Sequence, residues 1–256
     1  MVYIKSKREI EIMKEACRLA CLTHKEVERH IRPGITTYEL DKIAENFIKS
    51  NEAIPAQKNF PSGVQGVPNF PATLCISIND EVIHGIPSKK VQLKEGDVVS
   101  IDLVVLKYGF HGDAARTYIV GKPSPEKQKL VDVTTQAFYE GIKYARPGYR
   151  IGDISHAIGE YVEKNGFSVV KEFQGHGIGR EMHEEPGVPN YGKAGKGIRL
   201  EPGMTIAVEP MVIAGKPDIL ELEDGWTIVT EDGSLSAHYE NTILITEKRP
   251  EILTIV

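Results

Sequence analysis

The sequence predicts an α+β protein made of two similar halves. Three pairs of segments recur in the same order along the chain. The first pair begins with Arg-Pro-Gly, at residues 32–34 and 146–148, and each triplet precedes a segment with helical spacing of apolar residues. The second pair is HGI at residues 84–86 and 176–178, and the third is LKEGDVVSID at 93–102 with LEPGMTIAVE at 200–209. Because the order is kept while the spacing differs, we expect two αβ halves that share one fold.

The first half is expected to begin with two helices. Apolar spacing predicts an amphipathic helix over residues 6–31, which Pro33 and Gly34 end. A second helix should run from about Thr37 to Asn51, and the Pro-, Gly- and Asn-rich residues 54–71 should form a long loop. Strand-like segments follow at residues 73–78, 82–84, 98–105 and 117–120.

The second half repeats this order. Ser124 and Pro125 give an N-cap and a first-turn proline for a helix that should reach about residue 145. Another helix is predicted over residues 152–164, and strands are predicted near residues 167–173, 204–212, 226–230 and 238–246.

Composition excludes several classes of protein. The chain has 256 residues, of which 41% are hydrophobic, and its formal net charge is −5 with no basic block, so no nucleic-acid or anionic-membrane surface is indicated. No apolar stretch approaches the length of a membrane span, and the N-terminus lacks the apolar region of a signal peptide. The three cysteines, Cys17, Cys21 and Cys75, are expected to be small buried side chains. We therefore expect a cytoplasmic protein.

Asp102 and Asp113 lie eleven residues apart and flank a predicted hairpin turn at Lys107 and Tyr108. That turn would place the two carboxylates nearly opposite each other on paired strands. Directly opposed Cβ atoms are about 4.5–5.5 Å apart, and like charges at that distance are destabilising. Divalent cations shared by both carboxylates would offset the repulsion.

Three further residues extend this pair to a candidate metal site. His176, Glu209 and Glu240 also lie beside apolar, strand-like runs. A single such residue is more often an exposed or paired surface group, whereas five together favour a site. Four carboxylates and one imidazole suit Mn, Fe(II), Co or Zn, and a pair of such ions can activate water and polarise a carbonyl or phosphoryl group.

Two histidines in glycine-flanked segments, His84 and His183, are candidates for stabilising a developing oxyanion. The alternative is a loop histidine that bonds only to the backbone. The histidines of the predicted helices, among them His24, are expected at the surface or at the edge of the core. His111 and His238 each precede a proposed ligand by two residues, with no other support for a role. No histidine is spaced to activate Ser100, and Cys75 lacks an activating partner, so we reject a serine or cysteine nucleophile.

Short blocks around these residues resemble the type I methionine aminopeptidases. They are CISIN at residues 75–79, HGIP at 84–87, ID at 101–102, GD at 112–113, GHGIG at 175–179, VEPM at 208–211 and YE at 239–240. The resemblance runs from the first helix to residues 251–254. It implies the pita-bread fold, a single catalytic domain over residues 1–256 with halves of about 1–121 and 122–256 around a curved, mostly antiparallel sheet.

The resemblance also implies two divalent ions per chain and a role for each ligand. Asp102 would bind one ion, His176 and Glu209 would bind the other, and Asp113 and Glu240 would bridge them. The ions would be Co, Mn, Fe(II) or Zn.

The activity implied is hydrolytic removal of the initiator methionine from nascent chains whose second residue is small. A hydroxide that bridges the ions would attack the scissile carbonyl, and Glu209 would shuttle its proton. His84 and His183 would contact the substrate and stabilise the tetrahedral intermediate. The expected partners are the N-terminal methionine of nascent peptides and, transiently, the ribosome, and we expect a monomer.

A methionine side chain favours an apolar, polarisable and partly aromatic slot, for which the candidate walls are Cys75, Phe70, Met182 and Trp226. Three features depart from the family pattern. Met182 stands where many relatives carry an aromatic residue, Asn241 stands where histidine is usual, and the loop at residues 58–70 is longer than usual and is a candidate lid.

Two alternatives remain at this point. A proline-specific peptidase of the same fold usually carries a large N-terminal domain, whereas the first helix here starts near residue 6. A non-catalytic binding protein of this fold typically loses metal ligands, whereas all five are present here. Cleavage of Met-Ala but not Xaa-Pro peptides would distinguish the first alternative, and metal-dependent hydrolysis would exclude the second.

Overall fold

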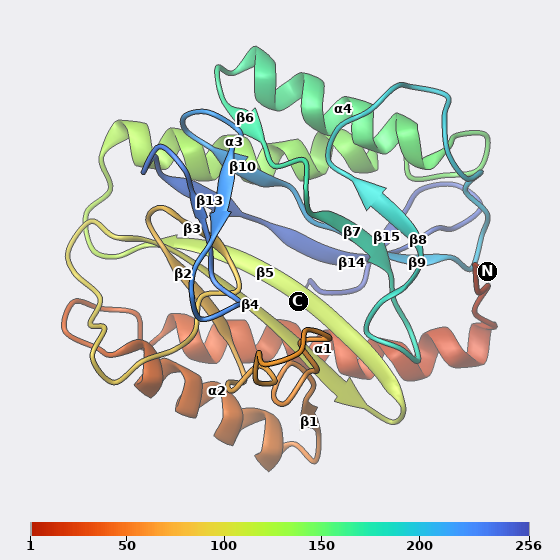
Figure 1. Cartoon of the computed structure of the whole chain (residues 1–256). Coiled ribbons are helices and arrows are strands. Elements are labelled where there is room, and N and C mark those ends of the chain that lie inside the picture. Colours follow the sequence, from red (N-terminus) through yellow and green to blue (C-terminus); the bar gives the residue numbers. More distant parts are fainter. Residues whose placement is uncertain (1, 256) are drawn as a thin grey trace.

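Two pairs of helices enclose the β-structure of this chain. The computed structural model describes residues 2–255. Helices α1 (Lys7–Glu28) and α2 (Thr37–Ser50) cover one side, and α3 (Pro125–Ile142) and α4 (Ile151–Lys164) cover the other (Figure 1). Ser6 with Glu9 and Thr36 with Glu39 form capping boxes that fix the starts of α1 and α2. In the described part of the chain, no helix is long and apolar enough to cross a membrane.

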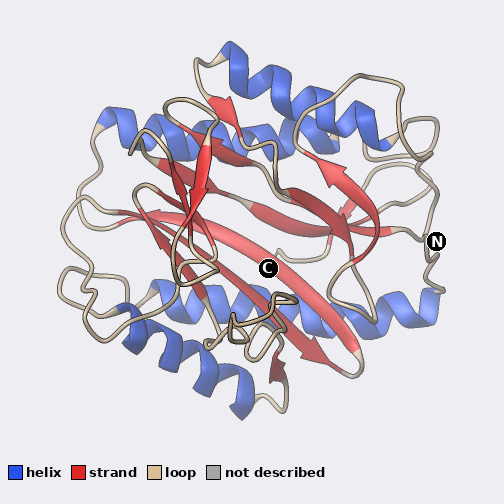
Figure 2. Cartoon of the chain, in the orientation of Figure 1, coloured by secondary structure: helices blue, strands red, loops and turns tan. Residues whose placement is uncertain are grey.

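The main sheet has nine strands, and all its described pairings are antiparallel (Figure 2). Seven strands lie in the order β1-β4-β5-β14-β9-β7-β8, while β2 pairs with β4 and β15 pairs with β14. Their bounds are β1 Ile54–Pro55, β2 Cys75–Ile78, β4 Val98–Lys107, β5 Phe110–Ile119, β7 Gln174–Gly177, β8 Glu184–Pro189, β9 Thr205–Val208, β14 Glu240–Leu244 and β15 Glu251–Ile252. The α+β class is therefore confirmed.

Two three-stranded sheets complete the β-structure. One has the order β13-β10-β6 and the other β11-β12-β3. These strands are β3 Glu81–Ile83, β6 Ser168–Val169, β10 Met211–Ile213, β11 Ile219–Glu221, β12 Ile228–Thr230 and β13 Ser236–His238.

The apolar faces of the two helix pairs form two separate cores against the strands. Leu40, Ile48 and Leu103 belong to the core beside α1 and α2, and Phe138 and Ile154 belong to the core beside α3 and α4. Helices α2 and α4 each have 14 residues. Equal helices on opposite sides are compatible with two similar halves, and the division near residue 121 stays a prediction.

Several expected strands have different bounds. The expected strand at 204–212 is two strands, β9 and β10, which separate at Glu209 and Pro210. The run at 238–246 is likewise divided between β13 and β14, and the segment at 117–120 is only the end of β5. Strands β7, β8, β11 and β15 were not predicted, because glycine, charge or short length hides their apolar alternation, and β1 lies within the segment 54–71 that was expected to be a loop.

Candidate metal centre

The β4–β5 hairpin positions Asp102 and Asp113, but not directly opposite each other. The turn residues are Tyr108 and Gly109, whose φ angles of 53° and 79° are typical of a type I′ hairpin turn. Asp102 pairs with Ala115, and Asp113 pairs with Val104. The expected opposition is therefore wrong by one residue in the turn. The two carboxylates are diagonal neighbours on the same face of the sheet, which still places them within reach of a shared ligand.

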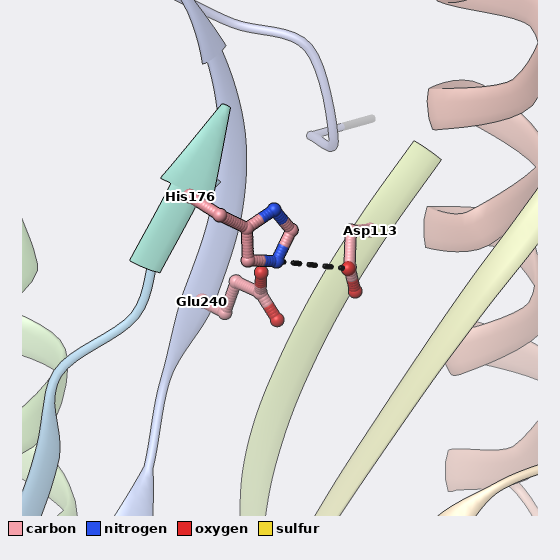
Figure 3. Close-up of side chains that lie close together, drawn as sticks. All are labelled: Asp113, His176 and Glu240. Carbon is pink, nitrogen blue, oxygen red and sulfur yellow. Dashed lines mark ion pairs between the residues drawn. The ribbon is translucent and has the colours of Figure 1, made fainter. Parts of the chain in front are cut away.

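The other three predicted ligands come from neighbouring strands. Glu240 starts β14 beside β5, His176 lies on β7, and Glu209 follows β9. His176 Nε2 lies 3.8 Å from Asp113 Oδ2 and 3.6 Å from Glu209 Oε1. Asp113, His176 and Glu240 each offer a ligand atom within 4.8 Å of the others (Figure 3). Side chains of these types, this close together, could hold a metal ion.

Several carboxylate oxygens in this cluster are buried without a hydrogen-bond partner within residues 2–255. Among the residues that the structure describes, Asp102 Oδ1, Asp113 Oδ1 and Glu240 Oε1 have no hydrogen-bond partner. Leaving such groups unsatisfied costs roughly 1–3 kcal/mol each and more when they are charged. A divalent cation would satisfy all three, so the residues present fit a metal centre.

Burial shifts the protonation equilibria of these groups toward their neutral forms. Burial raises the pKa of Asp102 to about 6 and that of Glu209 to about 8. Burial, followed by the charge of a neighbouring aspartate, raises the pKa of Asp113 and of Glu240 well above its ordinary value. Burial lowers the pKa of His176 to about 4, so its imidazole is neutral at pH 7, as a metal ligand must be.

All eleven predicted site residues line one cavity of about 320 Å³. Besides the five candidate ligands, these are His84, His183, Cys75, Phe70, Met182 and Trp226. Phe70 and Trp226 pack edge to face with ring centroids 5.2 Å apart, and the indole Nε1 donates to Pro68 O at 2.9 Å. The long loop therefore contributes to the cavity wall.

His84 and His183 face the cavity from different segments. His84 has a φ of 60°, and its ring contacts Phe173 at a centroid distance of 5.7 Å. His183 lies against His176, with ring centroids 4.4 Å apart, and against Phe60 at 5.3 Å. Burial lowers the pKa of both histidines, to about 4 for His84, so both are neutral N–H donors at pH 7.

Two polar residues at the centre were not predicted. Gln57 Nε2 donates to Asp102 Oδ2 at 2.8 Å, and His238 Nε2 lies 3.6 Å from Glu209 Oε2. Within the described chain, His238 Nε2 has no hydrogen-bond partner. The spacing of His238 before Glu240 was a weak signal for this position. Gln57 gave none, because it lies in an irregular segment.

The structure also bears on the predictions for two other histidines and for the cysteines. His24 is buried, with 3% of its surface exposed, and its Nε2 bonds to Ala114 O at 2.8 Å, so its expected place at the surface or core edge is wrong. His111 Nδ1 bonds to Gly179 O at 3.1 Å. All three cysteines are buried, as expected, and burial raises the pKa of Cys75 well above its ordinary value, which disfavours a thiolate nucleophile.

Comparisons with known proteins agree with this geometry. Residues 11–247 match the model of metallopeptidase family M24. The chain is 50% identical to methionine aminopeptidase 1 of Bacillus subtilis, with 99% of each chain covered, and 50% identical to the methionine aminopeptidase of Clostridium perfringens, with 100% covered in both. A crystal structure of methionine aminopeptidase from Thermotoga maritima superposes with a TM-score of 0.95 at 44% identity over 100% of each chain.

A more distant structural relative has the same fold in part of a longer chain. The prolidase from Pyrococcus horikoshii superposes with a TM-score of 0.77 at 24% identity, covering 99% of this chain and 63% of the prolidase.

Proposed function

The chain belongs to metallopeptidase family M24, and on that premise we propose that it is a metal-dependent aminopeptidase that removes the N-terminal methionine from proteins. Its relatives at 50% identity over the full length are methionine aminopeptidases, and its fold is the expected pita-bread fold. The observation that carries the proposal is the group of buried, unsatisfied carboxylate oxygens beside His176 in the cavity. Such groups are stable only with a cation or with added protons.

We assign two divalent ions to the five ligands. Asp102 would hold one ion, His176 and Glu209 the other, and Asp113 and Glu240 both. The central position of Asp113, diagonal to Asp102 and 3.8 Å from His176 Nε2, supports its bridging role. The ligand types fit Co, Mn, Fe(II) or Zn.

The chain's own residues would orient the substrate and move protons. When bound, the ions supply Lewis-acid activation of water and of the scissile carbonyl. Neutral His84 and His183 donate hydrogen bonds to the carbonyl oxygen as it gains negative charge. Glu209, which lies beside His176 and His238, would accept a proton and return it to the leaving amine.

Cavity walls explain a preference for methionine. Phe70 and Trp226 give aromatic edges, and Cys75 and Met182 add polarisable sulfur, which suits a thioether side chain. We propose that a small second residue is required, as the family resemblance implies. A cytoplasmic location, a monomeric state and transient ribosome association also stay proposals.

The two alternatives have less support. The prolidase is less similar and extends well beyond the matched region. A non-catalytic relative would not need a complete ligand set next to two neutral histidines. Hydrolysis of Met-Ala-Ser but not of Ala-Pro-Ser, dependent on added Mn²⁺, Co²⁺ or Fe(II), would support our proposal over both.

Variants test the assignment of the residues. Asp113→Ala should lose the metal pair and the activity, because it removes the proposed bridging carboxylate, whereas His84→Ala should keep the metal and lose rate by about 10²–10³-fold. Asp132→Ala, at an exposed position of α3, is the matched control. Metal content and turnover of Met-Ala-Ser are the measurements. Two bound ions and near-normal turnover in Asp113→Ala would contradict the two-metal assignment.

A further inference from the structure

The segment at residues 178–183 joins β7 to β8 and carries two cavity residues, Met182 and His183. Its first part is anchored to the sheet. Ile178 N donates to Thr205 O at 3.1 Å, and His111 N donates to Gly179 O at 2.8 Å. Beyond Gly179, the path of the backbone toward His183 depends on a different set of contacts.

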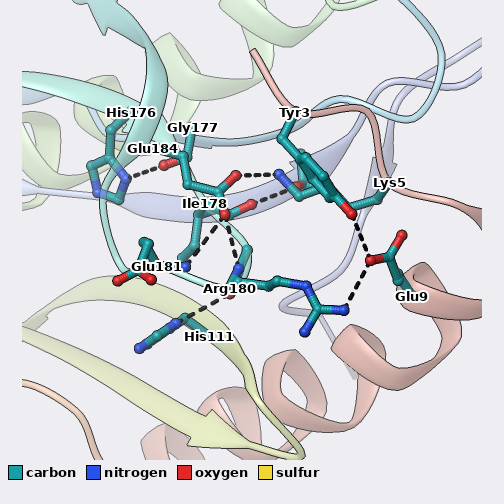
Figure 4. A network of polar contacts seen from close by, with 12 residues as sticks. Tyr3, Lys5, Glu9, His111, His176, Gly177, Ile178, Arg180, Glu181 and Glu184 are labelled. Atoms are coloured by element: carbon teal, nitrogen blue, oxygen red, sulfur yellow. Dashed lines mark hydrogen bonds and ion pairs between the residues drawn. The ribbon is translucent and has the colours of Figure 1, made fainter. Parts of the chain in front are cut away.

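Glu184, the first residue of β8, closes the segment from its far end. Its Oε1 accepts hydrogen bonds from Arg180 N at 2.8 Å and from Glu181 N at 3.3 Å (Figure 4). The carboxylate thus fixes the two residues that precede Met182 and His183. Any movement of Glu184 would be passed to both cavity residues through the short backbone between them.

Lys5, from the chain ahead of α1, holds Glu184 in turn. Lys5 Nζ donates to Glu184 Oε2 at 2.5 Å, and the side chains are 1% and 13% exposed. Lys5 N donates to Gly203 O at 2.9 Å, so the backbone here is also anchored. Lysine is almost never this buried without a pairing partner.

Gly179 allows this close approach. A Cβ added there would lie 2.5 Å from Lys5 Cε and 2.7 Å from Glu184 Oε1. The stem of Lys5 therefore lies directly against the segment as well as reaching its carboxylate.

A second connection from the N-terminal chain reaches the same segment at the surface. Arg180 Nη2 lies 3.0 Å from Glu9 Oε1, which also accepts from Tyr3 Oη at 2.8 Å. Arg180 is 58% exposed in this pair, so solvent weakens it and little positioning is expected from it. It supplies a matched control for the buried contact.

We propose that Lys5 is a positioning residue for His183, acting through Glu184. The N-terminal segment before α1 would then be part of the active-site architecture, although none of its described residues, 2–6, lines the cavity. The inference rests on the proposed function in one respect, the role of His183 toward the substrate. The other part of the inference, that Lys5 holds residues 178–184 in place, does not depend on any activity of the protein.

The test uses Lys5→Met, which keeps the aliphatic stem and removes the ammonium group. We expect kcat for Met-Ala-Ser to fall about 10–100-fold with a smaller change in KM, because a small displacement of a catalytic group has effects of this size. Metal content should not change. Amide hydrogen exchange of Arg180 and Glu181 should accelerate in the metal-free protein, while exchange in α3 and α4 should not.

A double-mutant cycle separates positioning from general damage. If Lys5 acts through His183, Lys5→Met should cost little further rate in a His183→Ala background. Arg180→Leu, which removes the exposed ion pair with Glu9 and keeps an apolar side chain against the Phe110 ring, should leave kcat and KM within about twofold of wild type. If Lys5→Met does not fold, Glu184→Gln takes its place, because glutamine keeps an acceptor for the two backbone amides and loses the charge that faces Lys5.

Unchanged kcat and unchanged exchange in the folded variant would overturn the inference, as would fully additive losses with His183→Ala. Absence of aminopeptidase activity in the wild type would instead refute the proposed function. The exchange measurement would still decide whether Lys5 holds the segment.

Discussion

Buried carboxylates in this protein fall into two groups. In the first, each charge has protein partners: Asp41 Oδ1 accepts from the backbone of Thr73 and Leu74, and Glu45 lies 2.5–2.7 Å from three lysine ammonium groups. In the second group, at the cavity, Asp113 and Glu240 each bury an oxygen without a partner among the described residues. Because the chain satisfies buried charges elsewhere, the unsatisfied oxygens at the cavity fit the cation-binding role proposed for these residues.

Gln57 gives a prediction at the scale of a single residue. Gln57→Met removes the hydrogen bond to Asp102 Oδ2 and keeps nearly the same volume. Partners of this kind orient ligating carboxylates, and their loss typically costs 10–100-fold in metal affinity. We expect the ion that Asp102 would hold to bind about 10–100-fold more weakly, and the ion that His176 and Glu209 would hold to bind as in the wild type. Calorimetric titration of the metal-free protein with Mn²⁺ measures both.

Met182→Leu is the control for Gln57→Met, because Met182 also lines the cavity and is not itself a proposed ligand. If Gln57→Met bound each ion as tightly as the wild type does, the Gln57 amide would have no part in metal binding.

Candidate ligands could be predicted because charge next to apolar strands is visible in one sequence. Asp102, Glu209 and Glu240 have that signature, Asp113 was found as the partner of Asp102 across the hairpin, and His176 lies in the repeated HGI block; all five line the cavity. Gln57 and His238 were missed as partners of the ligands because a neutral polar residue carries no such signal. Their contacts depend on tertiary packing between segments far apart in the chain.

At the scale of elements, the strand of the β4–β5 hairpin was predicted from the sequence, but its register was not. The alternation of apolar residues gave the strand over 98–105, but the turn was expected one residue early, and register follows from the turn. A shift of one residue in the turn moves the pairing by two positions, so both carboxylates kept the same face. The predicted clustering of the two carboxylates is therefore still correct, because side-chain direction in a strand has a period of two.

Close packing of this hairpin on α1 gives a prediction for Gly112. A Cβ at Gly112 would lie 2.4 Å from Cys17 N and 2.6 Å from Ala16 C, which are backbone atoms of a helix and cannot rotate away. Gly112→Ala should lower the free energy of unfolding by about 1–3 kcal/mol or more, and should weaken metal binding by moving Asp113. Urea unfolding of the metal-free protein and a Mn²⁺ titration measure the two effects.

Gly109→Asn is the control in the same hairpin. Gly109 has a φ of 79° and open space around its Cα, and asparagine tolerates this conformation. Its stability should stay within about 0.5 kcal/mol of wild type. Equal stability of both variants would mean that β5 and α1 separate easily, contrary to the packing argument.

At the scale of the whole molecule, the site lies where separate parts of the chain meet. Asp102 and Asp113 come from one hairpin, whereas His176, Glu209 and Glu240 come from strands more than 60 residues further along. Helix pairs on opposite sides hold these strands through two distinct cores. Folding brings these distant segments together and buries their carboxylates, which is unfavourable without a cation. We therefore expect metal binding to raise the free energy of unfolding of the whole protein.

This linkage predicts how stability changes with pH. Glu209 has a pKa of about 8 in the metal-free fold, above its ordinary value, and Asp113 and Glu240 are also raised, so the folded state binds protons that the unfolded state has lost by pH 7. Stability from these groups is complete below their ordinary pKa and is lost as pH rises through the folded value. Burial lowers the pKa of His84, His176 and His238 to about 4, so these three groups change the stability with pH only below about pH 7. From pH 7 to 8 the carboxyls therefore dominate.

For Glu209, with its pKa of about 8, the metal-free protein should lose up to about 1.4 kcal/mol per pH unit between pH 7 and 8, and the raised pKa values of Asp113 and Glu240 act in the same direction. A bound divalent ion replaces the protons, so the rise in Tm on adding Mn²⁺ should be larger at pH 8 than at pH 7. Thermal unfolding with EDTA or with Mn²⁺ measures this difference, and Glu209→Gln should reduce the slope of the metal-free protein because its amide does not titrate. A metal-free Tm that stays constant or rises over this interval, with a Mn²⁺ effect independent of pH, would mean that the carboxyls are already ionised in the fold. The metal would then not be what keeps their charges buried.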